Sequence, residues 1–483
     1  MKVHRRPCSW ILLCALMWPA GLGAQGVRGE LSLNWGWLQL RPYAVDSVPA
    51  SAVGGSGLQR QREDGTTVTC IDGEFCRWYE VASKSQDITP FTQDLRLAGW
   101  TGVQGLSFHG QLRTRFGSDD AWPRTEQEVD LLTGYLSYSR SEYQIKAGRM
   151  YRSSGLGFYN FDGASLVWKG LGWLWVDAYG GWSLARGVNA PRNGALYQAS
   201  DYLHTDRRSY LFGGQVGFRT GKVFSGSATY QRELRTDSYA LYSERAAVDL
   251  RAVVANWVLD GAASYDVAYD QVNDARLRIT TPSLGGIRLA AQARHYMPFF
   301  DYWTIWSAFS PVGFNEGRLS ATWTGRSIPL LIEAGGAYRE YEETGAAKGN
   351  ITVKNDGWRA FGRMAWRPDT WFVEGAYRAE EGFGAARYGG DMVLGLNLTS
   401  SGSSYVALRG TATETLSEFR SGERYVRGGG IEGAFDIGEA NLSLNGSLGF
   451  YRVEDENRPR SEAWTEGRAL LGLRWRFSAG GAR

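Results

Sequence analysis

Apolar and polar residues alternate along most of this chain, in runs of about ten residues with turn residues between them. The run from Leu106 to Phe116 puts mainly Leu, Phe and Gly on one face and Ser, His, Gln and Arg on the other. The same alternation recurs in 358–367, 441–450 and 470–477, and more weakly in 249–257. Because successive strand side chains point to opposite faces, each run predicts a strand with one apolar and one polar face.

The connections between these runs are of two kinds, and short turns alternate with longer polar loops. Short turns are expected near 102–105, 140–142, 170–172, 368–370 and 400–402. This asymmetry is typical of bacterial outer-membrane barrels, which keep short turns on the periplasmic side and long loops outside. We therefore predict an all-β fold, a single transmembrane antiparallel up-and-down β-barrel of roughly 20 to 22 strands.

The N-terminus has the layout of a secretory signal peptide. Three basic residues precede an apolar run from Trp10 to Trp18, and small residues follow up to Ala24. The apolar run is too short for a transmembrane helix, which needs about 20 residues. We expect residues 1–24 to be cleaved, with a retained anchor as the alternative, and residues 25–483 to form the barrel. The first strand then begins near the mature N-terminus, so we expect no plug or periplasmic domain.

The composition favours strands over transmembrane helices. The chain of 483 residues has 63 Gly, 20 Trp, 25 Tyr and 20 Phe but only 13 Pro, and its mean hydropathy is −0.33. Beyond the N-terminus no charge-free apolar stretch approaches helix-spanning length, so any spanning must use strands. Since about 16 strands already enclose an aqueous channel, a barrel of this size should have a wide lumen.

Charge and cysteine content argue against a nucleic-acid partner and against a metal ion. The net charge of +3 equals the three basic residues of the leader, so the remainder is neutral and nucleic-acid binding is not expected. Outside the leader only Cys70 and Cys76 remain. In an oxidising compartment they predict a disulfide, whereas half of a metal site is the weaker alternative. We expect no metal and no cofactor.

Arginines recur at inward positions of the predicted strands and could line the lumen. These are Arg96, Arg113, Arg115, Arg288, Arg294, Arg359, Arg363, Arg409, Arg468 and Arg474. An unpaired ladder of positive charge would favour anions. Inward acids such as Glu333, Glu374 and Glu466 could instead pair with these arginines across strands, and we favour such structural pairs.

Two loops stand out from the other connections. The first, 42–90, is long, polar and contains both cysteines; it is either a mobile surface loop with a local clip, which we favour, or an external lid or receptor surface. The second, 297–315, is rich in aromatic residues, which an exposed loop should not be. It could fold into the pore and offer rings to a solute, or it could pack on the wall or at the lipid headgroups. The constriction candidates are Phe299, Phe300, Asp301, Tyr302, Trp303, Trp306 and Phe309.

Two short segments resemble large bacterial outer-membrane porins. In 148–163, a Gly-Arg at a strand end and a Phe-Asp-Gly at the next strand resemble the residues that flank a channel-narrowing loop. The C-terminal Gly472, Trp475 and Phe477 resemble the signal read by the barrel assembly machinery, although the chain continues past Phe477.

This resemblance implies a passive channel for small hydrophilic solutes in the outer membrane, narrowed by inserted loops. The expected partners are outer-membrane lipids and lipopolysaccharide, the barrel assembly machinery and small solutes, and a homo-oligomer is left open. The alternatives are a barrel sheath for a partner such as an electron-transfer protein, or a surface receptor or adhesin. We do not expect an enzyme, since Asp201, His204 and Asp206 form the only arrangement with catalytic residue types worth naming.

Overall fold

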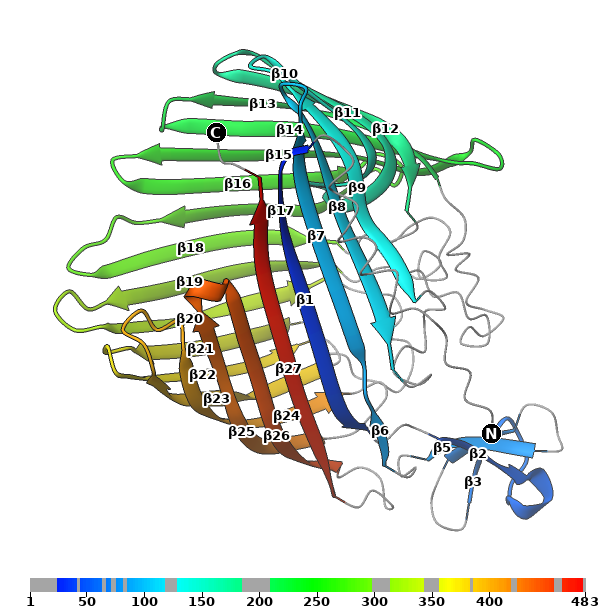
Figure 1. Ribbon diagram of the computed structural model, residues 1–483. Coiled ribbons are helices and arrows are strands. Elements are labelled where there is room, and N and C mark those ends of the chain that lie inside the picture. Colours follow the sequence, from blue (N-terminus) through cyan, green and yellow to red (C-terminus); the bar gives the residue numbers. More distant parts are fainter. Residues whose placement is uncertain are drawn as a thin grey trace, which may run out of the picture.

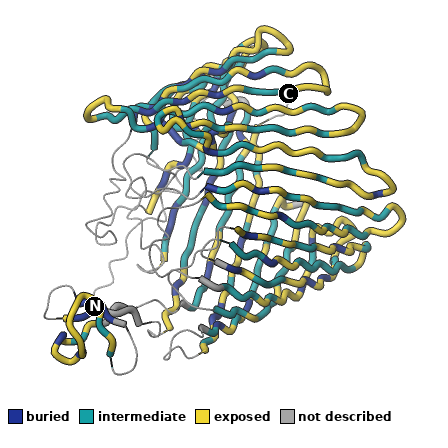
Figure 2. The backbone as a smooth tube through the Cα atoms, turned by 180° about the vertical axis from the view of Figure 1, so that it is seen from behind, coloured by how far each residue is buried: buried dark blue, intermediate teal, exposed yellow. Residues whose placement is uncertain are grey.

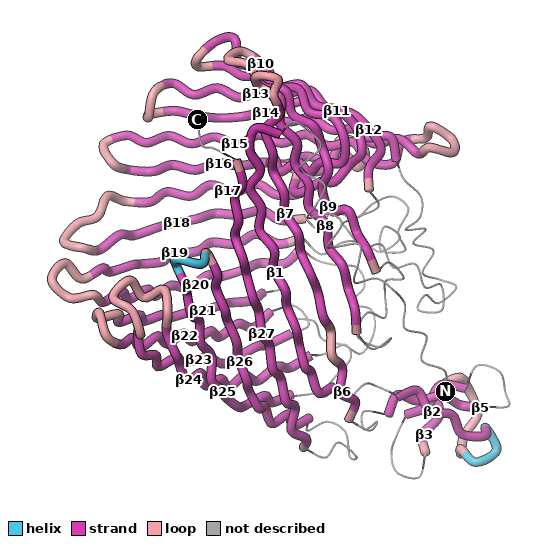
Figure 3. Tube along the Cα trace, viewed as in Figure 1, coloured by secondary structure: helices cyan, strands magenta, loops and turns pink. Residues whose placement is uncertain are grey.

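The computed structural model describes residues 24–40, 44–62, 67–70, 75–80, 85–117, 128–184, 209–297, 313–342, 356–382, 385–417, 424–455 and 463–480. In these ranges nearly all regular structure is β-strand, as Figure 3 shows, with two short 3-10 helices, η2 (Ala50–Ala52) and η6 (Gly438–Ala440). No helix among them is long and apolar enough to cross a membrane.

The wall strands follow one another around the barrel in chain order (Figure 1). They are β1 (Ala24–Leu40), β7 (Phe91–Thr101), β8 (Leu106–Phe116), β9 (Val129–Ser139), β10 (Tyr143–Ser154), β11 (Gly157–Leu171), β12 (Leu174–Ser183), β13 (Ser209–Thr220), β14 (Phe224–Arg235), β15 (Leu241–Val254), β16 (Trp257–Asp266), β17 (Gln271–Thr280), β18 (Ile287–Tyr296), β19 (Phe314–Thr324), β20 (Leu330–Tyr341), β21 (Asp356–Trp366), β22 (Trp371–Gly382), β23 (Ala385–Asn397), β24 (Tyr405–Ser417), β25 (Arg424–Ile437), β26 (Leu442–Asp455) and β27 (Trp464–Ala479).

The wall closes because its first strand pairs on both sides. β1 pairs antiparallel with β27 from Val27↔Ala479 to Leu38↔Arg468, and with β7 on its other edge. The short strand β6 (Gln86–Ile88) continues that second edge. The result is a closed antiparallel barrel of 22 strands with no plug domain evident in the described ranges. The predicted fold class is confirmed.

The two faces of the wall differ in chemistry, as the alternation requires. Large apolar side chains with high exposure lie on the outer face; they include Leu166, Trp182, Phe212, Leu250, Leu289, Ile332, Leu394 and Leu448. Their strand neighbours of opposite parity face the lumen and are mostly polar or charged. Few residues are buried along most strands (Figure 2), because a wall one layer thick has no second layer to cover it. An apolar outer belt on a closed barrel suits contact with lipid.

The two rims differ in their connections, and we call them the turn rim and the loop rim. The start of β1 at Ala24, the end of β27 at Ala479 and all five predicted short turns lie at the turn rim. The predicted weak run 249–257 is wrong in its boundary: it spans the end of β15, a turn at Ala255 and Asn256, and the start of β16. Both turn residues have positive φ, 49° and 66°, which gives the tight antiparallel reversal.

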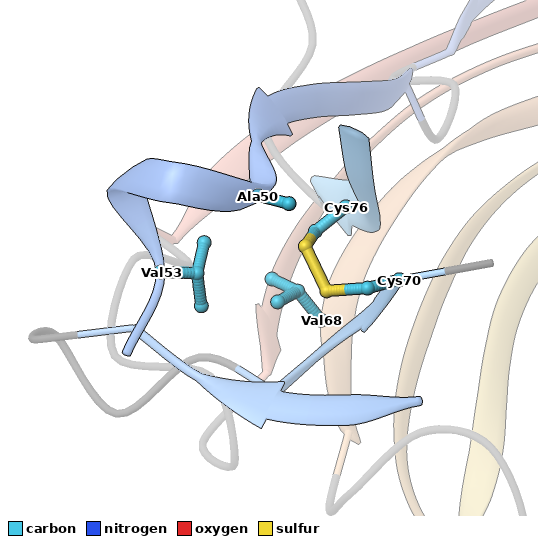
Figure 4. Packing of buried hydrophobic residues seen from close by; sticks show 5 residues of the cluster. All are labelled: Ala50, Val53, Val68, Cys70 and Cys76. Carbon is cyan, nitrogen blue, oxygen red and sulfur yellow. A yellow bond between two sulfur atoms is a disulfide. The ribbon is translucent and has the colours of Figure 1, made fainter. Parts of the chain in front are cut away.

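A small second sheet lies beyond the loop rim, within the predicted 42–90 loop. Its strands are β2 (Ala44–Pro49), β3 (Gln59–Gln61), β4 (Thr67–Cys70) and β5 (Phe75–Glu80), in the order β2-β5-β4-β3. Figure 4 shows its core, in which Ala50, Val53 and Val68 surround the Cys70–Cys76 disulfide. The predicted disulfide is confirmed. The described part of this loop is a folded unit with its own core rather than a locally clipped loop.

Candidate functional site

The lumen-facing arginines predicted from the sequence lie beside carboxylates. All of them except Arg288 have a carboxylate oxygen within 4.0 Å among the described residues. The pairs are Arg96–Glu30, Arg113–Asp94, Arg115–Asp130, Arg294–Asp274, Arg359–Glu316, Arg363–Glu374, Arg409–Glu432, Arg468–Glu466 and Arg474–Glu30. Their geometry fits the structural pairs that we favoured. Of the three acids named for this role, Glu374 and Glu466 pair in this way, whereas no ion pair within 4.0 Å joins Glu333 to another described residue.

Several of these carboxylates serve more than one arginine, so pairing does not neutralise the inner face. Glu316 contacts Arg339 at 2.6 Å and Arg359 at 2.5 Å with a side chain that is 1% exposed. Glu30 contacts Arg96, Arg474 and Arg476 at 3.8, 3.9 and 3.1 Å. Each such group of one carboxylate and its arginines therefore has a net positive formal charge.

The hairpin of β10 and β11 leaves the wall partway along its length. The pairing of β10 with β9 ends at Arg149↔Gly134, and the pairing of β11 with β12 begins only at Phe161↔Ser183. Between these two points the described ladders pair β10 and β11 only with each other, through the two-residue turn of Gly155 and Leu156. The segment that resembled a porin's inserted loop is thus a continuous β-hairpin, and we call 150–160 the inner hairpin.

Glycines allow the bend at the base of the inner hairpin. Gly148 has φ +129°, a conformation that residues with a Cβ rarely adopt, and a Cβ there would come within 2.8 Å of the Tyr135 Cα atom. Gly148 is opposite Gly163 on β11, where a Cβ would lie 2.7 Å from the Gly181 Cα atom. The backbones approach closely at this point, so the two strands can turn away from the wall.

The tip of the inner hairpin reaches β15, past three intervening strands. A Cβ on Gly155 would lie 2.9 Å from the Ala247 Cβ atom, and the Arg245 Nη2 group donates a 3.3 Å hydrogen bond to the Leu156 carbonyl oxygen. Arg245 and Ala247 share the face of β15 that carries Asp249 and Arg251 and is opposite to the lipid-facing Val248 and Leu250. The inner hairpin therefore lies against the lumen side of β12 to β15.

A small core and an ion pair hold this hairpin to the wall. Met150 and Phe161 pack with Tyr179 of β12 and Leu211 of β13, and all four are buried. Arg152 forms an ion pair with Asp177, donates a 2.8 Å hydrogen bond to Gln215 Oε1 and stacks over the Tyr179 ring at 4.5 Å. Apolar packing and a charged anchor thus act on the same face of the hairpin.

A hollow of about 840 Å³ separates the other face of the inner hairpin from the wall strands β1, β7, β8, β9 and β27. Tyr151 and Phe158 line it from the hairpin; their rings stack at 5.3 Å and are 56% and 58% exposed. Arg28, Arg96 and Arg476 line it from the wall. Rings and guanidinium groups thus face one water-filled space.

Sequence reasoning placed Arg96 in the lumen but did not single out Arg28, Tyr151 or Phe158. One signal was available: between Met150 and Phe161 both faces carry large side chains, such as Met150 and Arg152 on one face and Tyr151 on the other. In a barrel strand one polar face should meet water. Large side chains on both faces indicate a strand that is covered on one side and leaves the wall.

The remaining predicted residues divide into described and undescribed ones. Phe477 covers Gly29, its partner on β1, and its ring lies 4.9 Å from that of Trp475 in a tilted arrangement, while Gly472 lies opposite Asn34 and Asn445. The constriction candidates between Phe299 and Phe309 lie outside the described residues, as do the Asp201, His204 and Asp206 arrangement and the leader up to residue 23. The described residues contain no group of three His, Cys, Asp or Glu side chains that could hold a metal ion.

Comparison with known proteins finds likeness in structure only. No protein-family model matches the chain, and no curated protein matches it. The siderophore receptor PirA from Pseudomonas aeruginosa is 9% identical with a TM-score of 0.50, over 93% of this chain and 80% of that one. The outer membrane protein opdK from the same organism is 11% identical with a TM-score of 0.41, over 94% and 99% of the two chains. OccAB4 from Acinetobacter baumannii is 6% identical with a TM-score of 0.40, over 95% and 100%.

Proposed function

We propose that this chain is a porin-type β-barrel of the outer membrane and acts as a passive channel for small hydrophilic solutes, narrowed by its inner hairpin. The observation that carries this proposal is the polar inner face around open space, seen in the arginine–carboxylate groups and the hollow beside Tyr151. Movement would follow the concentration gradient, since a lumen lined in this way needs no cofactor. The structural neighbours named above include outer-membrane proteins, which is compatible with this role.

The charge of the lumen supports a weak preference for anions. Carboxylates shared between two or three arginines, as at Glu30 and Glu316, leave local positive potential. Because most predicted arginines are nevertheless paired, we expect selectivity to be modest. The reversal potential in a salt gradient measures it, and a cation preference would contradict this part of the proposal.

The aromatic loop is proposed as a second element at the loop rim. The strands on either side of it, β18 and β19, meet the loop at Tyr296 and Phe314, whose rings lie 5.2 Å apart. We propose that Trp303 and Trp306 reach the pore from there. In bilayer recordings, the double variant Trp303→Ala, Trp306→Ala should then change solute flux, and unchanged flux would remove the loop from the pathway.

The proposed partners follow from the same architecture. Outer-membrane lipids and lipopolysaccharide would cover the apolar belt, and the barrel assembly machinery would read the C-terminal strand with Gly472, Trp475 and Phe477. Phe477→Ala should lower the amount of folded protein in the outer membrane. Cross-linking in native membranes would detect additional copies of the chain.

The decisive experiment is planar-bilayer recording of the refolded protein. We expect large, steady openings, and we expect Arg152→Gln to raise or destabilise the open conductance, because it removes the ion pair that anchors the inner hairpin. Arg409→Gln is the matched control, since it breaks the Arg409–Glu432 pair on a part of the wall that no described hairpin covers. A correctly folded barrel without conductance would contradict the channel.

A barrel sheath for a partner protein is the second candidate. It is favoured by the width of a 22-strand wall in which the described residues form no plug; barrels of about this size are otherwise plugged in outer-membrane transporters. Purification under mild conditions followed by a haem stain and mass spectrometry separates the two functions. A stoichiometric partner together with a silent barrel would support the sheath.

A further inference from the structure

We propose that the hollow between the inner hairpin and the opposite wall is a binding site for small amphipathic anions that combine one carboxylate with one flat apolar face. The site consists of Tyr151 and Phe158 on the hairpin and Arg28, Arg96 and Arg476 on the wall. This inference rests on the proposed function, because it names the class of solute that the channel would hold in passage.

The aromatic half of the site lacks a structural explanation. Tyr151 and Phe158 are more than half exposed and project away from the hairpin's buried core, which Met150 and Phe161 supply. On the outer wall exposed rings meet lipid, but these two share their hollow with charged lumen residues such as Arg96. Apolar surface facing water is unfavourable unless it is used. The two rings stack with their planes 25° apart, and such a surface accepts a flat apolar group.

The arginines of the site have more N–H donors than their shared carboxylate can accept from. Among the residues that the structure describes, Glu30 is the single carboxylate within 4.0 Å of Arg96, Arg474 and Arg476, and the side chains of these arginines are 51% to 64% exposed. One carboxylate cannot occupy the donors of three guanidinium groups. A second carboxylate, brought by a solute, would take up the remaining donors in the charge-assisted geometry that arginine favours.

The size and composition of the hollow fit one small ligand. Its volume of about 840 Å³ lies within the range of about 300–1,000 Å³ usual for small-molecule sites. The wall brings the guanidinium groups and the hairpin brings the stacked pair of rings, so a ligand that contacts both must span the gap between them. A simple anion uses only the first half and a neutral ring only the second.

The test compares three probes as blockers of single-channel current: benzoate, acetate and benzyl alcohol. We expect benzoate to reach half-block at about a fivefold lower concentration than acetate, the size of one added aromatic contact, and benzyl alcohol to block least. Tyr151→Ser with Phe158→Ser should remove the difference between benzoate and acetate. Arg96→Gln with Arg476→Gln should weaken both anions together.

Controls separate this inference from the channel proposal. Phe361→Ser changes another lumen-facing aromatic residue, on β21 beside Arg318, and should leave benzoate block unchanged. If benzoate and acetate block equally, or if the hairpin variant keeps the difference, the site is overturned while the channel stands. If the barrel does not conduct, titration of benzoate and acetate into the protein in micelles decides the site, because equal affinity would overturn it.

Discussion

The wall from β11 to β15 and the wall from β18 to β25 are built from the same alternating strands, yet among the described residues only the first has a hydrophobic core. The inner hairpin covers the first wall and buries Phe161, Tyr179 and Leu211 against it. No described segment covers the second wall, which we call the bare wall, and its inner face holds cross-strand ion pairs such as Arg359–Glu316. A core requires two layers, so it appears where a second layer is supplied, and elsewhere water and charge take its place.

Truncating the core residue of each wall should show the largest difference. Phe161 is 1% exposed, so Phe161→Ala should lower the free energy of unfolding by about 3–5 kcal/mol. Phe361 on the bare wall is only half-buried beneath Arg318, so Phe361→Ala should cost about 1 kcal/mol. Urea titration in micelles, followed by tryptophan fluorescence, measures both values. Equal losses would mean that the hairpin cluster is not a core.

Removing a shared carboxylate should destabilise the protein more at a buried ion pair than at an exposed one, by less than the core truncation does. Glu316→Gln leaves two arginines facing one uncharged amide at a buried position, and the expected loss is about 2–3 kcal/mol. Glu30→Gln removes a carboxylate whose arginine partners are mostly exposed, so at most about 1 kcal/mol should be lost. The same urea titration measures both losses. A greater loss at Glu30 than at Glu316 would contradict the larger contribution assigned to the buried ion pairs of Glu316.

The external sheet has a small core of its own, and a change there should affect the smallest part of the molecule. Its few buried residues depend on the Cys70–Cys76 disulfide, whose short loop should contribute roughly 2 kcal/mol. Cys70→Ser should therefore speed proteolysis within residues 44–80 while the barrel keeps its unfolding midpoint. Mass spectrometry of limited digests checks this, and unchanged cleavage would show that the sheet holds together without the bond. Unchanged cleavage together with unchanged conductance would also remove the lid reading of the 42–90 loop.

A residue of the candidate site could be predicted when its position depends on sequence neighbours, and could not when it depends on residues distant in the sequence. Arg96 was assigned to the lumen because alternation along one strand is a local property. Tyr151 and Phe158 could not be placed in the same way, since their surroundings come from β1, β7 and β27, distant in sequence. The sequence marked the segment 148–163 as unusual, but with an inserted loop between strands rather than a continuous hairpin.

The sequence by itself determined the class of fold, the lipid-facing and lumen-facing sides of its strands, the asymmetry of the rims and the disulfide. Each of these follows from spacing along the chain, because a strand's faces alternate strictly and a turn is a short local event. Only the tertiary structure decided that one hairpin leaves the wall, which strands it covers and which arginines share a carboxylate. These depend on the curvature of the closed barrel, which brings distant residues such as Leu156 and Arg245 together and which spacing along the chain does not encode.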